Sequence, residues 1–183
     1  MLSGRQLGRR QTDEVALSPS TIVTSRLTLT PLVPEDADVM FDVLDDERLH
    51  EFTGGRPLTL DELRSRYQRL AVGHSTDHTE LWFNWIVRLS DAQQPVGGMQ
   101  ATVATDGSTA DVAWEVGVRF QGQGFASEAA AAVVQWLVDR HVQLIRAFVH
   151  PDHAASARVA ARAGLQPTLD RVDGEVVWHR PAR

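Results

Sequence analysis

A short glycine-containing loop that leads into an alanine-rich segment is the feature that most constrains the fold of this 183-residue chain. Gly122 and Gly124 lie between a strand-like run that ends at Val118 and a helical pattern over 125–141. Glycine lets the backbone turn tightly, and the first N–H groups of a helix lack intrahelical partners. Such a loop can hold an anion such as a pyrophosphate, but a plain strand-to-helix turn would show the same residues.

Two common nucleotide-binding loops do not match this segment. A Walker-type loop needs a lysine and a hydroxyl residue after its last glycine, whereas Gly124 is followed by Phe125 and Ala126. A dinucleotide-binding loop needs a third glycine where Ser127 stands, and it lies early in a parallel strand–helix–strand unit. The loop here follows three runs that we interpret as antiparallel strands. Both nucleotide-binding identities are therefore disfavoured.

The apolar pattern predicts a single mixed α/β domain (α+β mixed sheet) over 21–183, preceded by a flexible tail over 1–20 that is rich in Gly, Ser, Gln and Arg. The predicted strands are 24–32, 81–87, 96–103, 110–118, 144–149 and 176–178, and the predicted helices are 34–44, 59–70, 125–141 and 154–163. The order is one strand, two helices, three strands, a helix, a strand, a helix and one or two strands.

Composition excludes several classes of function. The chain has no cysteine, so it has no disulfide, no thiolate metal site and no acyl-cysteine intermediate. No apolar run approaches the roughly 20 residues of a membrane span, and no secretory signal pattern is present, so we expect a cytoplasmic protein. A formal net charge of −6 is poorly suited to nucleic acid or anionic lipid, so neither is expected as a partner.

Two segments carry motifs that can be recognised. The run 121–126 reads Gln-Gly-Gln-Gly-Phe-Ala and is followed by Ser127 and Glu128, and the segment 151–165 begins Pro-Asp-His-Ala-Ala-Ser. The first resembles the pyrophosphate loop and helix start of the GNAT superfamily of acetyl-CoA-dependent N-acyltransferases, in its RimJ/RimL-like branch. The second resembles that branch's Pro-x-Asn-x-x-Ser motif. The element order is also similar, so the resemblance covers residues 22–180.

The resemblance implies a GNAT-type fold with a largely antiparallel sheet, flanked by helices, whose fourth and fifth strands splay apart to admit acetyl-CoA. Backbone groups of two strand residues would pair with the pantetheine arm, and the loop amides would hold the pyrophosphate. A histidine where the family has asparagine, and the motif's serine, would also contact the cofactor. The implied cofactor-binding residues are Val116, Val118, Gln121, Gly122, Gln123, Gly124, Phe125, Ala126, Ser127, His153 and Ser156.

The resemblance also implies direct attack of a neutral amine on the thioester. Asp111 and Glu115 share one face of a strand, so either could accept the amine's proton through water, although a solvated strand face is the alternative. Ser156 is the candidate for protonating the leaving thiolate, and its alternative role is a hydroxyl bonded to the backbone. The family's usual tyrosine is replaced by Ala160, and the only tyrosine, Tyr67, is distant in sequence.

Several properties stay open. The acceptor is either a protein N-terminal amine or a small-molecule amine such as an aminoglycoside, a polyamine or an amino-acid-like metabolite, and the acidic net charge favours a cationic one. A non-catalytic CoA-binding sensor or interaction module is the alternative function, and a homodimer is an open option. His74 and His78 are spaced four residues apart, but they lack the further ligands of a zinc site, so no metal is predicted.

Overall fold

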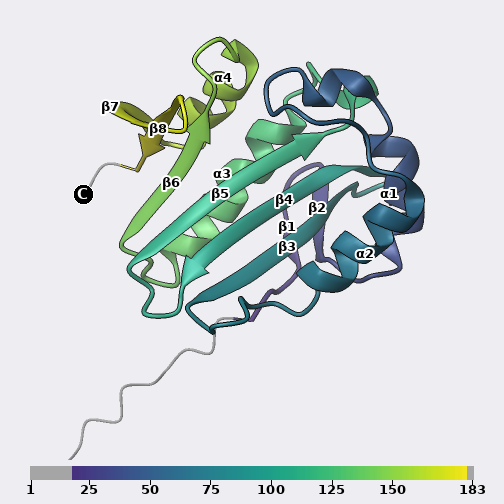
Figure 1. Cartoon of the computed structure of the whole chain (residues 1–183), viewed down its shortest axis with the longest axis horizontal. Coiled ribbons are helices and arrows are strands. Elements are labelled where there is room, and N and C mark those ends of the chain that lie inside the picture. The colour runs from purple at the N-terminus through teal and green to yellow at the C-terminus, as the bar shows by residue number, and fades with distance from the viewer. Residues whose placement is uncertain (1–17, 181–183) are drawn as a thin grey trace, which may run out of the picture.

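The computed structural model describes residues 18–180, which form one eight-stranded sheet in the order β1-β2-β3-β4-β5-β6-β8-β7 (Figure 1). The strands are β1 (Ile22–Val23), β2 (Leu27–Pro31), β3 (Glu80–Leu89), β4 (Pro95–Ala104), β5 (Thr109–Val116), β6 (Leu144–Val149), β7 (Gln166–Val172) and β8 (Glu175–His179). The α-helices are α1 (Asp36–Leu44), α2 (Leu60–Leu70), α3 (Phe125–Val138) and α4 (Ala154–Arg162), and the 3-10 helices are η1 (Glu47–His50) and η2 (Val118–Phe120). The predicted mixed α/β fold is confirmed.

The sheet opens between β5 and β6. Every neighbouring pair of strands is antiparallel except this one, which is parallel and pairs only 109–111 with 144–146. β6 is paired with β8 along its other edge, and beyond that point β5 and β6 diverge, as Figure 1 shows. These are the fourth and fifth of the predicted strands, because the two-residue β1 precedes them. The predicted splay is therefore confirmed.

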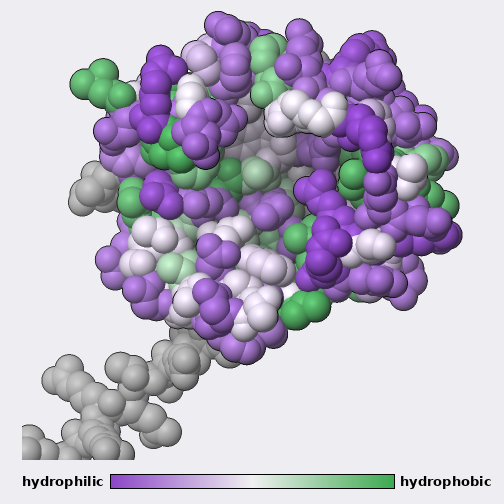
Figure 2. All heavy atoms as spheres, in the orientation of Figure 1, coloured by the Kyte–Doolittle hydropathy of each residue, from purple (hydrophilic) through white to green (hydrophobic). Residues whose placement is uncertain are grey.

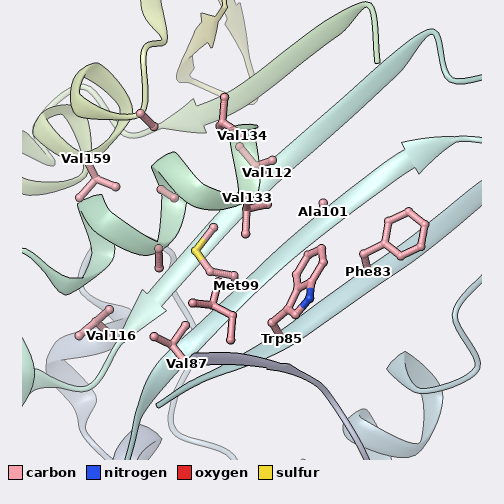
Figure 3. Close-up of a cluster of buried hydrophobic side chains, with 14 of the residues drawn as sticks. Phe83, Trp85, Val87, Met99, Ala101, Val112, Val116, Val133, Val134 and Val159 are labelled. Carbon is pink, nitrogen blue, oxygen red and sulfur yellow. The ribbon is translucent and has the colours of Figure 1, made fainter. Parts of the chain in front are cut away.

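One part of the core lies between the sheet and α3. Side chains from alternate positions of β3, β4 and β5 meet the apolar face of α3 in the cluster drawn in Figure 3. Trp85 of β3 is 1% exposed and packs edge-on against Trp136 of α3, with ring centroids 5.2 Å apart. Burying one large apolar side chain stabilises a fold by roughly 1.5–3 kcal/mol, so this layer fixes α3 and the loop before it against the sheet.

Helices α1 and α2 cover part of the opposite face. Helix α2 begins where the sequence predicts, because Thr59 and Glu62 form a reciprocal capping box at its first turn. Arg88 of β3 donates to the Asp36 carboxylate of α1 at 2.6 Å and ties that helix to the sheet. Tyr67 and Leu63 of α2 are buried, so this face of the helix packs against the domain.

Some predicted boundaries were wrong for local reasons. Strand β5 ends two residues early, because the chain turns at Gly117 into η2; glycine is needed at this turn, since a side chain there would collide with Val43 of α1. Helix α3 ends at Val138 instead of residue 141, since His141 takes a positive φ of 61° that a helix cannot continue. Strand β1 and helix η1 were not predicted.

Ser20, the last residue of the predicted tail, contacts the core of the domain. Residues 1–17 and 181–183 lie outside the described residues. Ser20 accepts hydrogen bonds from two tryptophans, with its backbone carbonyl from Trp85 Nε1 at 2.9 Å and with its hydroxyl from Trp136 Nε1 at 3.0 Å. Between residues 18 and 180 no helix is long and apolar enough to cross a bilayer. The domain limits and the cytoplasmic location stay predictions.

Candidate active site

A cavity of about 1210 Å3 lies at the open end of the V between β5 and β6. Figure 2 shows the surface hollowed between these elements. We call one wall the loop side, which consists of residues 118–127 and the first turn of α4. We call the other wall the sheet side; it is formed by the faces of β3, β4 and β5 that are turned toward α2, and by Arg66 and Tyr67 of α2.

The loop side presents a row of free backbone amides. Gly122 and Gly124 have φ values of +76° and +83°, in the left-handed region that glycine adopts without strain. The N–H groups of residues 122–127 have no acceptor among the described residues, and the first bonded amide of α3 is that of Glu128. Residues 122–124 precede a 14-residue helix and 125–127 are its first residues, so the partial positive charge of the helix N-terminus reinforces the attraction of these amides for an anion. The arrangement fits a pyrophosphate.

A carboxylate clamps this loop to the start of β2. Glu128 accepts hydrogen bonds from Thr24 Oγ1 at 2.7 Å, Ser25 Oγ at 3.0 Å and the Arg26 backbone and Nε at 3.0 and 2.7 Å. Arg26 also donates to the carbonyl of Gln123 at 3.1 Å. Burial alone would raise the pKa of Glu128, but the hydrogen bonds from Thr24, Arg26 and Ser25 lower it to about 2. The ionised clamp therefore holds the loop in place.

The predicted pantetheine-binding residues lie at the end of β5. The carbonyl of Val116 accepts from the Gln121 side chain at 3.0 Å, and the carbonyl of Val118, now in η2, accepts from the Gln121 backbone at 3.2 Å. Each carbonyl has a second lone pair, so both keep capacity for one further donor. The Gln121 side chain thus shapes the turn, while its role toward a cofactor stays a prediction.

Ser156, on α4, is joined to β5 across the splay. Its hydroxyl oxygen accepts a hydrogen bond from Trp114 Nε1 at 3.1 Å. No backbone partner of this hydroxyl is present in the part of the chain that the structure describes. A hydroxyl that already accepts has its own hydrogen available to donate, and both side chains line the cavity.

His153 forms part of the wall at the N-terminus of α4. Its ring stacks on Phe52, with centroids 4.2 Å apart and planes 14° apart. Burial lowers the pKa of His153, so the imidazole is neutral at physiological pH. Phe52 lies in the segment after η1, which therefore closes over the loop side from the opposite edge. Nothing local in the sequence indicated this contact, because the two rings are about 100 residues apart.

The sheet side has a floor of small residues between polar ones. In the register of the sheet, Gly98 lies between Ile86 and Glu115, and in the next row Gln100 lies between Asn84 and Ala113. Gly98 has no side chain and Ala113 has only a methyl group, so space remains beside Glu115 and in front of the two carboxamides. All of these residues line the cavity.

Of the two predicted carboxylates, Glu115 is the one that lines the cavity. Burial raises its pKa, and the Coulombic interactions of Arg66 and His50 with the carboxylate offset only part of that effect. Tyr67 is 5% exposed and lines the same space, and burial together with the nearby Glu115 charge raises the pKa of its phenol. Tyr67 was noted only as distant in sequence, and its place in the cavity was not predicted, because α2 lies far from both motifs in the chain. A pair of groups with such raised pKa values in one cavity is typical of a functional site.

Asp111, the other predicted carboxylate, lies elsewhere. It accepts two hydrogen bonds from Arg146 of β6, at 2.7 Å from Nε and 3.0 Å from Nη2. These two residues are the last register pair before β5 and β6 separate, and neither lines the cavity. The structure therefore places Glu115 in the cavity and Asp111 at the base of the V. Between residues 18 and 180, no group of three or more potential metal ligands was found.

Comparisons with known proteins agree with this geometry. Residues 26–166 match the model of the acetyltransferase (GNAT) domain. The chain is 26% identical over 164 residues to the uncharacterized N-acetyltransferase p20 of Bacillus licheniformis, a match that covers 86% of this chain and 91% of that protein.

Two solved structures show the same fold. One is RimL, a ribosomal L7/L12 alpha-N-protein acetyltransferase in complex with coenzyme A, with a TM-score of 0.73, 16% identity and coverage of 88% of this chain and 97% of that one. The other is AAC(6')-Ib in complex with ribostamycin and coenzyme A, with a TM-score of 0.67, 20% identity and coverage of 84% and 91%. Because the family model spans most of the sequence, this chain belongs to the GNAT family and is an acyl-CoA-dependent acyltransferase.

Proposed function

We propose that this protein transfers an acetyl group from acetyl-CoA to a primary amine by direct attack. The observation that carries the proposal is that the free amides of 122–127 and the desolvated carboxylate of Glu115 open into one cavity. When bound, acetyl-CoA supplies the acetyl group as a thioester. The loop amides would hold its pyrophosphate, and the backbone of Val116 and Val118 and the side chains of His153 and Ser156 would hold its pantetheine end.

Glu115 is the proposed base. An amine reaches the site mostly as an ammonium ion, and it must lose a proton before its nitrogen can attack. A carboxylate whose pKa is raised by burial is a stronger proton acceptor near neutral pH than an exposed one. Asp111 is less suited to this step, because its oxygens are engaged by Arg146 outside the cavity lining.

Ser156 is the proposed acid. Its hydroxyl oxygen is held by Trp114 Nε1, which leaves the hydroxyl hydrogen directed to another acceptor. Proton donation to the departing sulfur would complete the transfer. Because a thiolate is already a good leaving group, we expect this acid to contribute about tenfold, less than the roughly 10²-fold of a typical general acid. Trp114 positions Ser156 and is not itself a proton donor in the reaction.

The identity of the amine is not set by the fold. One structural neighbour is an α-N-protein acetyltransferase and another is bound to ribostamycin, although both have TM-scores near 0.7. A protein N-terminus and a small-molecule amine are therefore both compatible with the architecture. The polar groups of the sheet side are the part of the site that would choose between them.

Release of free thiol from acetyl-CoA, measured with a panel of amines, tests the proposed function. We expect thiol release that depends on the amine and that matches, mole for mole, the N-acetylated product seen by mass spectrometry. Binding of CoA without amine-dependent release would contradict acetyl transfer and would favour a CoA-binding sensor or interaction module instead.

A further inference from the structure

An unpartnered amide lies in the sheet side of the cavity. Asn84, the only asparagine of the chain, is 7% exposed. Its Nδ2 is the one buried side-chain nitrogen or oxygen that lacks a hydrogen-bond partner in the part of the chain that the structure describes. A buried polar group without a partner destabilises the fold, so a residue of this kind at a cavity wall needs an explanation.

A second carboxamide lies beside it. Gln100 of β4 is the cross-strand partner of Asn84, and such partners have Cβ atoms about 4.5–5.5 Å apart. Gln100 Nε2 donates to Thr102 at 3.3 Å, which leaves its carbonyl oxygen without a donor among the described residues. The torsion that turns a carboxamide is broad, so each group can present either N–H or C=O to the cavity. Together they offer both donors and acceptors.

The position of the pair relative to Glu115 suggests what they bind. Gln100 is diagonal to Glu115 across the β4–β5 pair, and diagonal neighbours lie about 7–8 Å apart. An extended residue advances about 3.3–3.6 Å. In an acceptor whose amine lies beside Glu115, the first or second amide group after the amine would therefore lie over the side-chain carboxamides of Asn84 and Gln100. Gly98 and Ala113 leave the floor open along this line.

The charge of the cavity wall does not favour a polycation. The charged side chains that line it are five arginines and three glutamates: Arg48, Arg56, Arg66, Arg158, Arg162, Glu51, Glu115 and Glu175. Arg48 and Arg56 are paired with the Asp46 and Glu62 carboxylates, so the lining carries no net negative charge although the whole chain has a formal charge of −6. The expectation of a cationic acceptor, which rested on the net charge, therefore does not extend to the site itself.

We infer that Asn84 and Gln100 form a subsite for an amide group of the acceptor, so that the preferred acceptor is a primary amine followed by an amide. This inference rests on the proposed function and adds the class of acceptor to it. A free peptide or protein N-terminus and a small amino-acid amide share this chemistry. Spermidine and plain alkylamines lack it.

The test compares acceptors and variants in one set of kinetic measurements. The acceptors are a heptapeptide with a free N-terminus, glycinamide, n-butylamine and spermidine, and the measured quantity is kcat/KM for each. The variants are Asn84→Leu and Gln100→Leu, with Gln166→Leu, an exposed strand glutamine of β7, as the matched control. The ratio of an amide-bearing acceptor to n-butylamine, compared between variant and parent, cancels the different basicities of the amines.

We expect the parent to prefer the amide-bearing acceptors and either variant to lower that preference by about tenfold, which is the loss of one hydrogen bond. Gln166→Leu should keep the parental ratio.

A ratio within twofold of the parent in both variants, or a parental preference for spermidine, would overturn the subsite while acetyl transfer itself stands. Gln100→Leu changes a half-buried position, so it carries the test if Asn84→Leu does not fold. A parent that binds CoA and acetylates none of the four amines would overturn the proposed function, and the subsite with it.

A preference for the heptapeptide over glycinamide would identify a chain terminus as the source of the amide. Equal use of both would identify the small amide as sufficient. Either result supports the subsite, because both acceptors carry the group that the carboxamides are inferred to bind.

Discussion

The two walls of the cavity are built in different ways. The loop side consists mainly of backbone amides from one short stretch, 122–127, held by the Glu128 clamp. The sheet side consists of side chains from β3, β4, β5 and α2, and its polar groups include Glu115, Asn84, Gln100 and Tyr67. A backbone cradle can bind the same anion whatever the neighbouring side chains are, whereas a side-chain surface changes with every substitution. The difference indicates a fixed donor site and an adjustable acceptor site.

The largest expected effect is on the sheet side. Glu115→Gln keeps the shape of the side chain and removes its basicity, so we expect kcat to fall by about 10²-fold or more. The acidic limb of the pH–rate profile should disappear with it. Asp111→Asn is the comparison, because Asp111 is bound by Arg146 away from the cavity, and it should keep that limb. A Glu115→Gln variant with the parental kcat and an unchanged acidic limb of the pH–rate profile would show that Glu115 is not the base.

The next effect concerns the loop side alone. Gly124→Glu places a charged side chain on a backbone with φ +83° beside the free amides, so we expect the dissociation constant of CoA to rise by about tenfold or more. That is about 1.4 kcal/mol, and it can be measured by calorimetry. Gly174→Glu carries the same backbone strain, with φ +88°, outside the cavity lining and should leave CoA affinity unchanged. Unchanged affinity in a folded Gly124→Glu would contradict the assignment of the loop.

A smaller effect is expected where the two walls meet. Ser156→Ala should lower the turnover rate at saturating acetyl-CoA by about tenfold, and Trp114→Phe by a few fold, because it removes only the N–H that holds the hydroxyl. In the double variant the tryptophan change should add nothing further. Turnover of Ser156→Ala within twofold of the parent would exclude the serine as the acid.

The smallest effect is on stability and follows from the raised pKa of Glu115. The folded protein holds this proton more tightly than the unfolded chain, so ionising the group destabilises the fold as pH rises from about 4.5 through the raised pKa. Glu115→Gln should therefore gain stability relative to the parent at pH 7.5, and that gain should vanish near pH 4. Thermal melts at both pH values measure this, and a difference that does not change with pH would show that the carboxylate is not desolvated.

The contrast between the walls also explains what the sequence could predict. The loop, the helix after it and the serine of α4 lie in two contiguous motifs, so the resemblance of these motifs to the GNAT family was enough to indicate them. The order of strands and helices followed from apolar periodicity. Tyr67 and Asn84 come from separate elements and reach the cavity only through the sheet register and the packing of α2. The Arg26–Glu128 pair joins residues 102 positions apart, and no short-range pattern indicates such a contact.

A crystal structure of the protein with CoA and a non-reactive amine would test the central claim most directly. We predict pyrophosphate oxygens within hydrogen-bond distance of the amides of 122–127, the thiol near Ser156 Oγ, and the amine on the Glu115 side of the sulfur. The same structure would contradict the account if the pyrophosphate lay away from this loop, or if Glu115 and the thiol did not face a common space.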